Sequence, residues 1–173
     1  MALKVLLGGA RSGKSRLAVE LAKAAVAPVT FIATGEARDR EMAERIAAHR
    51  AERPSGWVTV AAPTDLDGAL AAADSDHAVV VDCLTLWVAN LLERGVPSAT
   101  VVATAESAAA FAAARAPLTI AVSNEVGLGI VPPTPLGREY RDVLGSVNAA
   151  WVAASAEAAL VVAGRLLPLE VAG

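Results

Sequence analysis

The chain has 173 residues, of which 55% are hydrophobic but only 3% are aromatic. This length predicts one domain with a sizeable core, built mainly from Ala, Val, Leu and Ile. The formal net charge is -3 and no basic face is evident, so we expect no nucleic-acid partner. A single cysteine, Cys83, excludes an intrachain disulfide framework and is typical of a reducing cytoplasm.

The apolar residues do not indicate a membrane protein. Charges or turn residues interrupt every apolar run before the roughly 18 residues that a membrane helix needs. The opening stretch MALKVLL leads directly into a glycine-rich loop, which leaves no room for a cleavable leader. We therefore expect a cytoplasmic protein with no membrane partner. The apolar surplus indicates either surface buried between subunits or simply an alanine-rich composition.

Short apolar runs alternate along the chain with longer, helix-compatible stretches. The apolar runs predict strands at 4–7, 29–33, 58–60, 78–82, 118–123 and 159–163. The longer stretches predict helices at 15–25, 38–53, 65–73, 84–94, 98–115 and 137–156. Because the strands are continuous apolar runs, the pattern is typical of an α/β fold whose parallel sheet is covered on both faces. We expect one domain over residues 1–173.

The segment between the first strand and the first helix reads GGARSGKS, residues 8–15. It fits the P-loop pattern G-x-x-x-x-G-K-[ST]. The glycines let backbone N–H groups turn toward phosphate oxygens, and the following helix offers its N-terminus to the same anion. Lys14 can reach the β- and γ-phosphates, and the Ser15 hydroxyl can bind Mg²⁺. The loop predicts nucleotide binding but does not choose among pumps, switches, motors and kinases.

An acidic residue closes the buried run AVVVD at Asp82. P-loop proteins commonly hold their metal ion with such a residue at the end of another strand. We therefore predict that Asp82 serves the metal or the nucleotide, the alternative being an N-cap for the next helix. We interpret the neighbouring Cys83 as a packing residue.

The charged helix predicted at 38–53 carries a histidine between arginines. Arg45, His49 and Arg53 are spaced i, i+4 and i+8, so they would share a face. Two guanidinium groups would favour the neutral, nucleophilic imidazole and hold a phosphate against it. A histidine so placed could attack a nucleotide phosphorus. The spacing equally allows a packing role beside Ile46, and the chain's other histidine, His77, is interpreted as a surface residue.

Several separated stretches are together more specific than the P-loop. They are GGARSGKS from Gly8, FIAT from Phe31, the Asp39–Glu41–Met42 region, RIAAHRAERP from Arg45, W-x-T from Trp57, DCLTLWVANLL from Asp82, NEVGLGIVP from Asn124 and REYRDVLGSVN from Arg138. In this order, they resemble the bifunctional adenosylcobinamide kinase / adenosylcobinamide-phosphate guanylyltransferases of cobalamin biosynthesis. The resemblance spans most of the chain.

The resemblance implies two reactions. In the first, ATP or GTP phosphorylates the aminopropanol hydroxyl of adenosylcobinamide. In the second, GMP is transferred from GTP to that phosphate through a GMP–histidine phosphoramidate, giving adenosyl-GDP-cobinamide and pyrophosphate. The guanylylated histidine of the family falls on His49. The resemblance also implies a RecA-like P-loop NTPase, a three-layer sandwich, assembled as a homotrimer.

The resemblance assigns nucleotide contacts to the P-loop, to the residues around the end of the second strand, to the residues after the histidine and to Asp82. They are Gly8, Gly9, Ala10, Arg11, Ser12, Gly13, Lys14, Ser15, Ala33, Thr34, Gly35, Arg50, Ala51, Glu52, Arg53 and Asp82. Lys14 and His49 would be the catalytic residues, with Mg²⁺ held by Ser15 and Asp82. Asp82 and Glu125 are both candidates for the base of the kinase step, although Glu125 could equally serve loop structure.

Three positions depart from the family pattern. Ala61 stands where the family often carries a glutamate in W-x-T-x-E, which puts guanosine affinity or base preference in question. Asp82 stands where a relative can carry glutamate, and Asn148–Ala149 replaces an asparagine–glutamine pair. Two other functions stay open at the level of sequence: a kinase for another small molecule with a structural His49, and a nucleotide-binding module without catalysis.

Overall fold

The computed structural model describes residues 3–25 and 27–171, and over these residues it forms a seven-stranded sheet. The strand order is β3-β2-β4-β5-β1-β6-β7. Neighbouring strands are parallel except for the pair β6 and β7. The strands are β1 (Leu3–Gly8), β2 (Val29–Ala33), β3 (Val58–Ala61), β4 (Ala78–Asp82), β5 (Thr119–Asn124), β6 (Glu157–Val162) and β7 (Arg165–Leu169).

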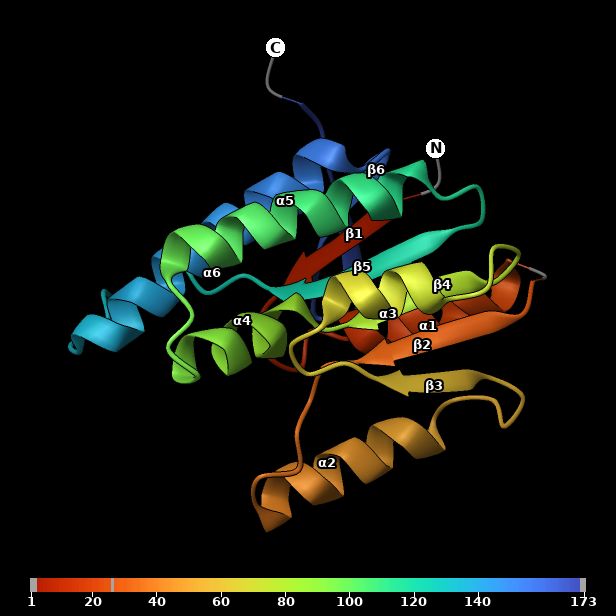
Figure 1. Ribbon diagram of the computed structural model, residues 1–173, viewed down its shortest axis with the longest axis horizontal. Coiled ribbons are helices and arrows are strands. Elements are labelled where there is room, and N and C mark those ends of the chain that lie inside the picture. The colour runs from red at the N-terminus through yellow and green to blue at the C-terminus, as the bar shows by residue number, and fades with distance from the viewer. Residues whose placement is uncertain (1–2, 26, 172–173) are drawn as a thin grey trace.

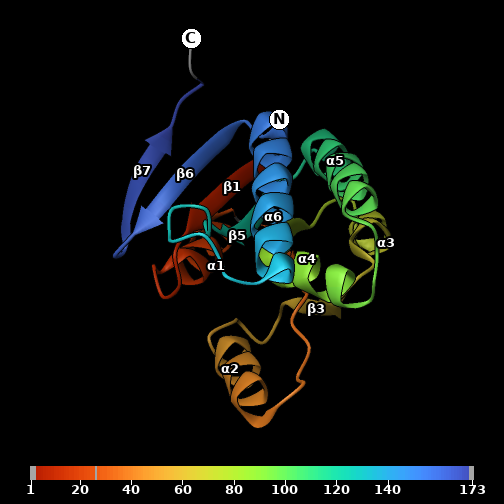
Figure 2. The same cartoon turned by 90° about the vertical axis from the view of Figure 1, so that its left-hand side faces the viewer.

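Helices connect the strands and cover the sheet unequally. They are α1 (Lys14–Ala24), α2 (Arg40–Ala51), α3 (Leu66–Ala72), α4 (Leu84–Glu93), α5 (Ser98–Ala114) and α6 (Pro135–Ala154). Figure 2 shows α3, α4, α5 and α6 on one face of the sheet and α1 on the other. The fold therefore has three layers, one of which is a single helix.

The central strand β4 shows how the two faces are filled. Successive side chains of a strand point to opposite faces. Val79 and Val81 accordingly pack in the core under α3 to α6, and Val80 packs in the core under α1. The larger core holds Trp87 and Trp151, both 0% exposed, and the Trp87 Nε1–H donates to the Thr64 carbonyl at 2.9 Å.

The carboxyl ends of the parallel strands meet at one edge of the sheet. Gly8 pairs with Asn124, and Ala33 pairs with Asp82. Figure 2 looks onto this edge. Because each of these strands leads into a loop there, the loops after β1, β2, β4 and β5 gather around one place, which is where ligands bind in such sheets.

Helix α2 stands apart from the rest of the fold. In both views it lies beyond the edge strand β3, connected through two loops (Figures 1 and 2). None of its described side chains is buried. It begins with Asp39 as N-cap, whose side chain accepts the Met42 N–H at 2.7 Å. It ends at Ala51, so Arg53, predicted to lie within this helix, follows it instead.

The antiparallel strand β7 has no counterpart among the predicted strands. It is joined to β6 by a turn in which Ala163 and Gly164 have φ of 48° and 75°. Positive φ at both residues is what a tight hairpin turn requires. Pro168 is tolerated because β7 is an edge strand.

Two further observations concern sequence predictions. His77 is largely buried rather than a surface residue: its side chain is 14% exposed and its Nδ1 lies 2.9 Å from the Thr30 hydroxyl. Among the helices of the described residues, none combines the length and apolarity needed to cross a membrane.

Candidate active site

The P-loop follows β1 and is held in shape by backbone contacts to the β6–β7 hairpin. A Cβ added at Gly8 would lie 2.4 Å from the Val161 carbonyl oxygen, so only glycine fits there. Gly13, the N-cap of α1, has φ of 97°, a conformation that favours glycine. The Gly164 N–H donates to the Ser12 carbonyl at 2.8 Å. The hairpin turn therefore supports the loop from behind.

Lys14 and Ser15 open α1 and carry the polar groups of the loop. The Lys14 ammonium donates to the Gly9 carbonyl at 3.0 Å, which folds the side chain back over the loop where phosphates would lie. The Ser15 hydroxyl donates to Asp82 Oδ1 at 3.3 Å. The predicted pair of Ser15 and Asp82 is thus brought together at the sheet edge.

Asp82 lies where several charges converge. Burial raises the pKa of its carboxyl group, and His49, the Ser15 hydrogen bond, Arg53 and Lys14 act against that rise. A carboxylate and a serine hydroxyl offer the hard oxygen ligands that Mg²⁺ binds alongside nucleotide phosphates. The two side chains therefore fit a Mg²⁺ ion.

His49 faces the P-loop from the last turn of α2. Its side chain is 40% exposed and its Nδ1 lies 3.8 Å from Glu52 Oε2. Two neighbouring cavities, of about 150 and 480 Å³, meet at the loop. His49, Lys14 and Ser15 line both of them. The imidazole is therefore neither buried in the core nor turned away from the phosphate site.

Arg53 reaches the site by a different route from the one predicted. Because α2 ends at Ala51, Arg53 does not continue the face of His49. Its guanidinium lies 3.5 Å from the centre of the Phe31 ring, which stacks in turn on Trp57. From there it lines the smaller cavity together with His49. The side chain of Arg45 lies outside the described part of the structure.

The other predicted nucleotide contacts fall into two groups, residues that line one of the two cavities and residues that line neither. Arg11, Ser12, Gly13 and Glu52 line the larger cavity, and Ala33 and Gly35 line the smaller one. Neither wall includes Gly8, Gly9, Ala10, Thr34, Arg50 or Ala51.

Thr34 supports the loop after β2 instead of facing the cavity. It is 0% exposed. Its hydroxyl donates to the Cys83 carbonyl at 2.7 Å and accepts from the Cys83 N–H at 2.8 Å. Burial raises the pKa of the Cys83 thiol to about 11, which agrees with a packing role for that residue.

Asn124, at the end of β5, belongs to the site although no role was predicted for it. It lines the smaller cavity. Its N–H donates to the Thr85 hydroxyl at 2.7 Å, and its carbonyl accepts from Asn148 Nδ2 at 3.0 Å. The sequence could have indicated Asn124 as a site residue, because it directly follows a predicted strand. Glu125, in contrast, accepts the Gly127 N–H and lines neither cavity, as a loop-structure role requires.

Ala61 occupies the carboxyl end of the edge strand β3. It pairs with Ala33, which lines the smaller cavity, and it is exposed. The position is therefore next to a residue of the cavity wall across the β2–β3 pair.

Comparison with known proteins decides the family. A family model described as cobinamide kinase / cobinamide phosphate guanyltransferase matches residues 4–169. The chain belongs to this family. The cobinamide kinase / guanyltransferase description names both activities, so the predicted family and the predicted enzyme class are confirmed.

Three relatives of the cobinamide kinase / guanyltransferase chain agree with this assignment. The bifunctional adenosylcobalamin biosynthesis protein CobP of Pseudomonas aeruginosa is 41% identical, covering 96% of both chains. The corresponding proteins named CobU are 39% identical in Escherichia coli and 40% identical in Salmonella typhimurium, each covering 92% of this chain and 95% of the relative.

The fold is also similar to that of a solved ATPase. A chain described under "a prototypical ATPase from the type III secretion system of pathogenic bacteria" aligns with a TM-score of 0.56 and 16% identity. The alignment covers 92% of this chain and 50% of that one. At this identity the likeness concerns the fold alone, and it confirms the predicted α/β P-loop architecture.

Proposed function

We propose that this cobinamide kinase and guanylyltransferase of cobalamin biosynthesis carries GMP on His49 between its two substrates. One observation carries the proposal: the imidazole lines the same two cavities as Lys14 and Ser15 of the P-loop. A triphosphate held by the loop would therefore lie beside a side chain able to attack it. GTP serves the second reaction, and ATP or GTP serves the kinase reaction.

In guanylylation, an imidazole nitrogen of His49 attacks the α-phosphorus of GTP. A P–N bond forms as the P–O bond to pyrophosphate breaks. The Lys14 ammonium and the N–H groups of the loop offset the charge that develops on the leaving pyrophosphate. The Glu52 carboxylate lies beside the imidazole, with one oxygen 3.8 Å from Nδ1.

In the transfer that follows, a phosphate oxygen of adenosylcobinamide phosphate attacks the same phosphorus. The P–N bond breaks, a P–O–P bond forms, and His49 is regenerated. In the kinase reaction the hydroxyl oxygen of adenosylcobinamide bonds to the terminal phosphorus of the nucleotide, the P–O bond to the nucleoside diphosphate breaks and the hydroxyl proton is released, so His49 is not required. Catalysis of that step rests on positioning and on charge stabilisation by the P-loop.

Ser15 and Asp82 are the residues that would hold Mg²⁺. When bound, the ion neutralises phosphate charge. The chain's own part is to place the serine hydroxyl and the aspartate carboxylate 3.3 Å apart at the end of β4.

We further propose a homotrimer working in the cytoplasm. Large apolar side chains stay exposed on the β6–β7 hairpin, among them Val162, Leu166 and Leu167 at 52–57% exposure. A surface of this kind fits contact between subunits. Sedimentation equilibrium of the whole chain measures the number of subunits, and a monomer at all concentrations would exclude the trimer.

Labelling with GTP marked at the α-phosphate tests the role of His49. We expect an acid-labile, alkali-stable adduct in the unmodified chain and none in His49→Ala, which should still phosphorylate adenosylcobinamide. His77→Gln is the matched control, because the chain has two histidines. An adduct that survives His49→Ala, or no adduct in the unmodified chain, would contradict the proposal.

A further inference from the structure

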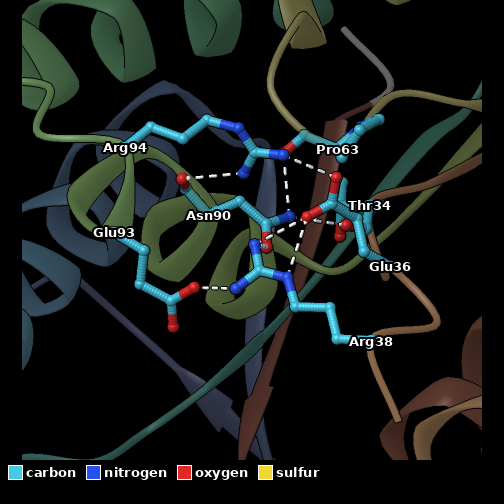
Figure 3. A network of polar contacts seen from close by, with 7 residues as sticks. All are labelled: Thr34, Glu36, Arg38, Pro63, Asn90, Glu93 and Arg94. Carbon is cyan, nitrogen blue, oxygen red and sulfur yellow. Dashed lines mark hydrogen bonds and ion pairs between the residues drawn. The ribbon is translucent and has the colours of Figure 1, made fainter.

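A network of charged side chains joins the loop before α2 to the end of α4 (Figure 3). We call it the arm latch; its members are Glu36, Arg38, Asn90, Glu93 and Arg94. Arg38 donates through Nε and Nη2 to one carboxylate oxygen of Glu36, at 3.0 and 2.6 Å. Arg94 Nη2 pairs with the other oxygen of Glu36 at 2.6 Å. Arg38 also pairs with Glu93.

Asn90 connects the arm latch to the core. It is only 5% exposed. Its Oδ1 accepts from Arg38 Nη2 at 2.9 Å, while its Nδ2 donates to the carbonyls of Thr34 at 2.8 Å and Pro63 at 2.9 Å. Arg94 Nη1 donates to the Asn90 carbonyl at 3.0 Å. The arm latch is therefore fixed to the fold at α4 and holds the loop by the side chains of Glu36 and Arg38.

Helix α2 has few other anchors. None of its described side chains is fully buried. Met42, Ile46 and His49 line the cavity, and Ile46 lies beside Gly35, where an added Cβ would be 3.5 Å from Ile46 Cδ1 and 3.4 Å from Leu86 Cδ1. At its far end the chain is held by Arg53 on the Phe31 ring. Besides this apolar contact, two short attachments hold the chain around α2: the ion pairs of the arm latch before the helix and the Arg53–Phe31 contact after it.

We propose that the arm latch is a positioning device for His49, which sets the rate of guanylylation and leaves the kinase reaction unaffected. The inference rests on the proposed function, since it assumes that His49 attacks GTP. The kinase reaction needs the P-loop, which lies on β1 and α1 and does not depend on α2. A change in the arm latch therefore separates the two activities of one chain.

The charges of the arm latch suit this role. Its four charged side chains are 26–49% exposed, and exposed ion pairs contribute little to global stability. Hydrogen bonds from Arg94 and then Arg38 lower the pKa of Glu36, so the carboxylate stays ionised. Because none of the described side chains of α2 is fully buried, we expect even weak pairs to influence where the helix stands.

The first test compares the two activities in Glu36→Gln and Arg94→Ala. The matched control is Arg40→Ala, which removes an exposed ion pair to Glu44 within α2 itself. We expect single-turnover labelling of His49 by GTP to slow roughly 10- to 100-fold in the two latch variants. Phosphorylation of adenosylcobinamide and the melting temperature should match the control. Equal losses in both activities, or no loss in either, would overturn the proposal.

The second test measures the helix directly. Amide hydrogen exchange over residues 37–53 should accelerate in Glu36→Gln and Arg94→Ala but not in Arg40→Ala. Unchanged exchange would overturn the arm latch even if His49 is guanylylated normally. Absence of the adduct in the unmodified chain would contradict the proposed function alone, and the exchange rates would still decide whether the arm latch holds α2.

Discussion

The hydroxyl of Ser15 and the carboxylate of Asp82 lie 3.3 Å apart, although 67 residues separate them in the sequence. The contact joins the start of α1 to the end of β4. It exists because β1 and β4 run parallel on either side of β5, so that their following loops leave the sheet at the same edge. A serine and an aspartate so placed form one oxygen-rich corner beside the nucleotide loop.

Asp82→Asn should weaken Mg²⁺ binding in both reactions. The amide keeps the shape of the carboxylate and its contact with Ser15 but removes the charge. We expect the Mg²⁺ concentration for half-maximal rate to rise by about tenfold or more. Initial rates against Mg²⁺ measure this, with the exposed Asp76→Asn as control. The same Mg²⁺ dependence in both variants would exclude Asp82 as a ligand.

Gly8→Ala should destabilise the fold. The new Cβ would lie 2.4 Å from the Val161 carbonyl oxygen, so β1 or the hairpin must shift, at a cost of about 1–3 kcal/mol. Nothing lies within 4 Å of a Cβ at Gly9, and Gly9→Ala should change the free energy of unfolding by less than about 0.5 kcal/mol. Urea unfolding compares the two, and equal stabilities would show that the hairpin does not restrain the loop.

Ala61→Glu should raise the preference for GTP over ATP. The exposed side chain at the end of β3 would extend a carboxylate toward the cavity beside Ala33, where it can accept hydrogen bonds from guanine. A charge-assisted hydrogen bond of this strength corresponds to about tenfold in affinity. Titration calorimetry with both nucleotides measures the ratio, with Ala61→Gln as the uncharged control. A parallel gain for ATP would argue against base recognition.

The raised pKa of the Tyr140 phenol should lower the free energy of unfolding at alkaline pH. Burial, and then the nearby Cys83, raise the pKa of its phenol to about 12, above the value of about 10 in an unfolded chain. The unfolded chain therefore loses its proton first, and stability falls as the pH rises from about 10 to 12. Because this is the single tyrosine, tyrosinate absorbance follows it directly. Tyr140→Phe should show a shallower decline in stability, and identical slopes would contradict the assignment.

The sequence predicted most strands and helices to within one or two residues, because the core strands are uninterrupted apolar runs. Val79, Val80 and Val81 are all 0% exposed, as expected for an apolar run that predicts a buried strand. Strand β7 was not predicted because its residues are exposed and Pro168 lies within it. Neither an apolar periodicity nor burial therefore indicates a strand at this place in the sequence. Strand β7 is defined by its antiparallel pairing with β6, which is a tertiary interaction that the local sequence does not indicate.

The site could be predicted where a residue ends a strand, as Asp82 does, or belongs to the P-loop, as Lys14 does. Prediction was weaker where the backbone changes direction. Arg53 meets His49 because the chain leaves α2 and packs on Phe31, not because of helical spacing. Thr34 sits in a stretch shared with the family, yet its position under Cys83 depends on how β2 and β4 align.

The contact between the P-loop and the β6–β7 hairpin also bears on how the protein is made. Ser12 is synthesised well before its partner Gly164. A growing chain on the ribosome must therefore hold an unfinished phosphate cradle until β6 has been translated and has paired with β1. Under the proposed function, GTP would stabilise only chains in which both segments are present, because a ligand that binds the folded form shifts the folding equilibrium toward it.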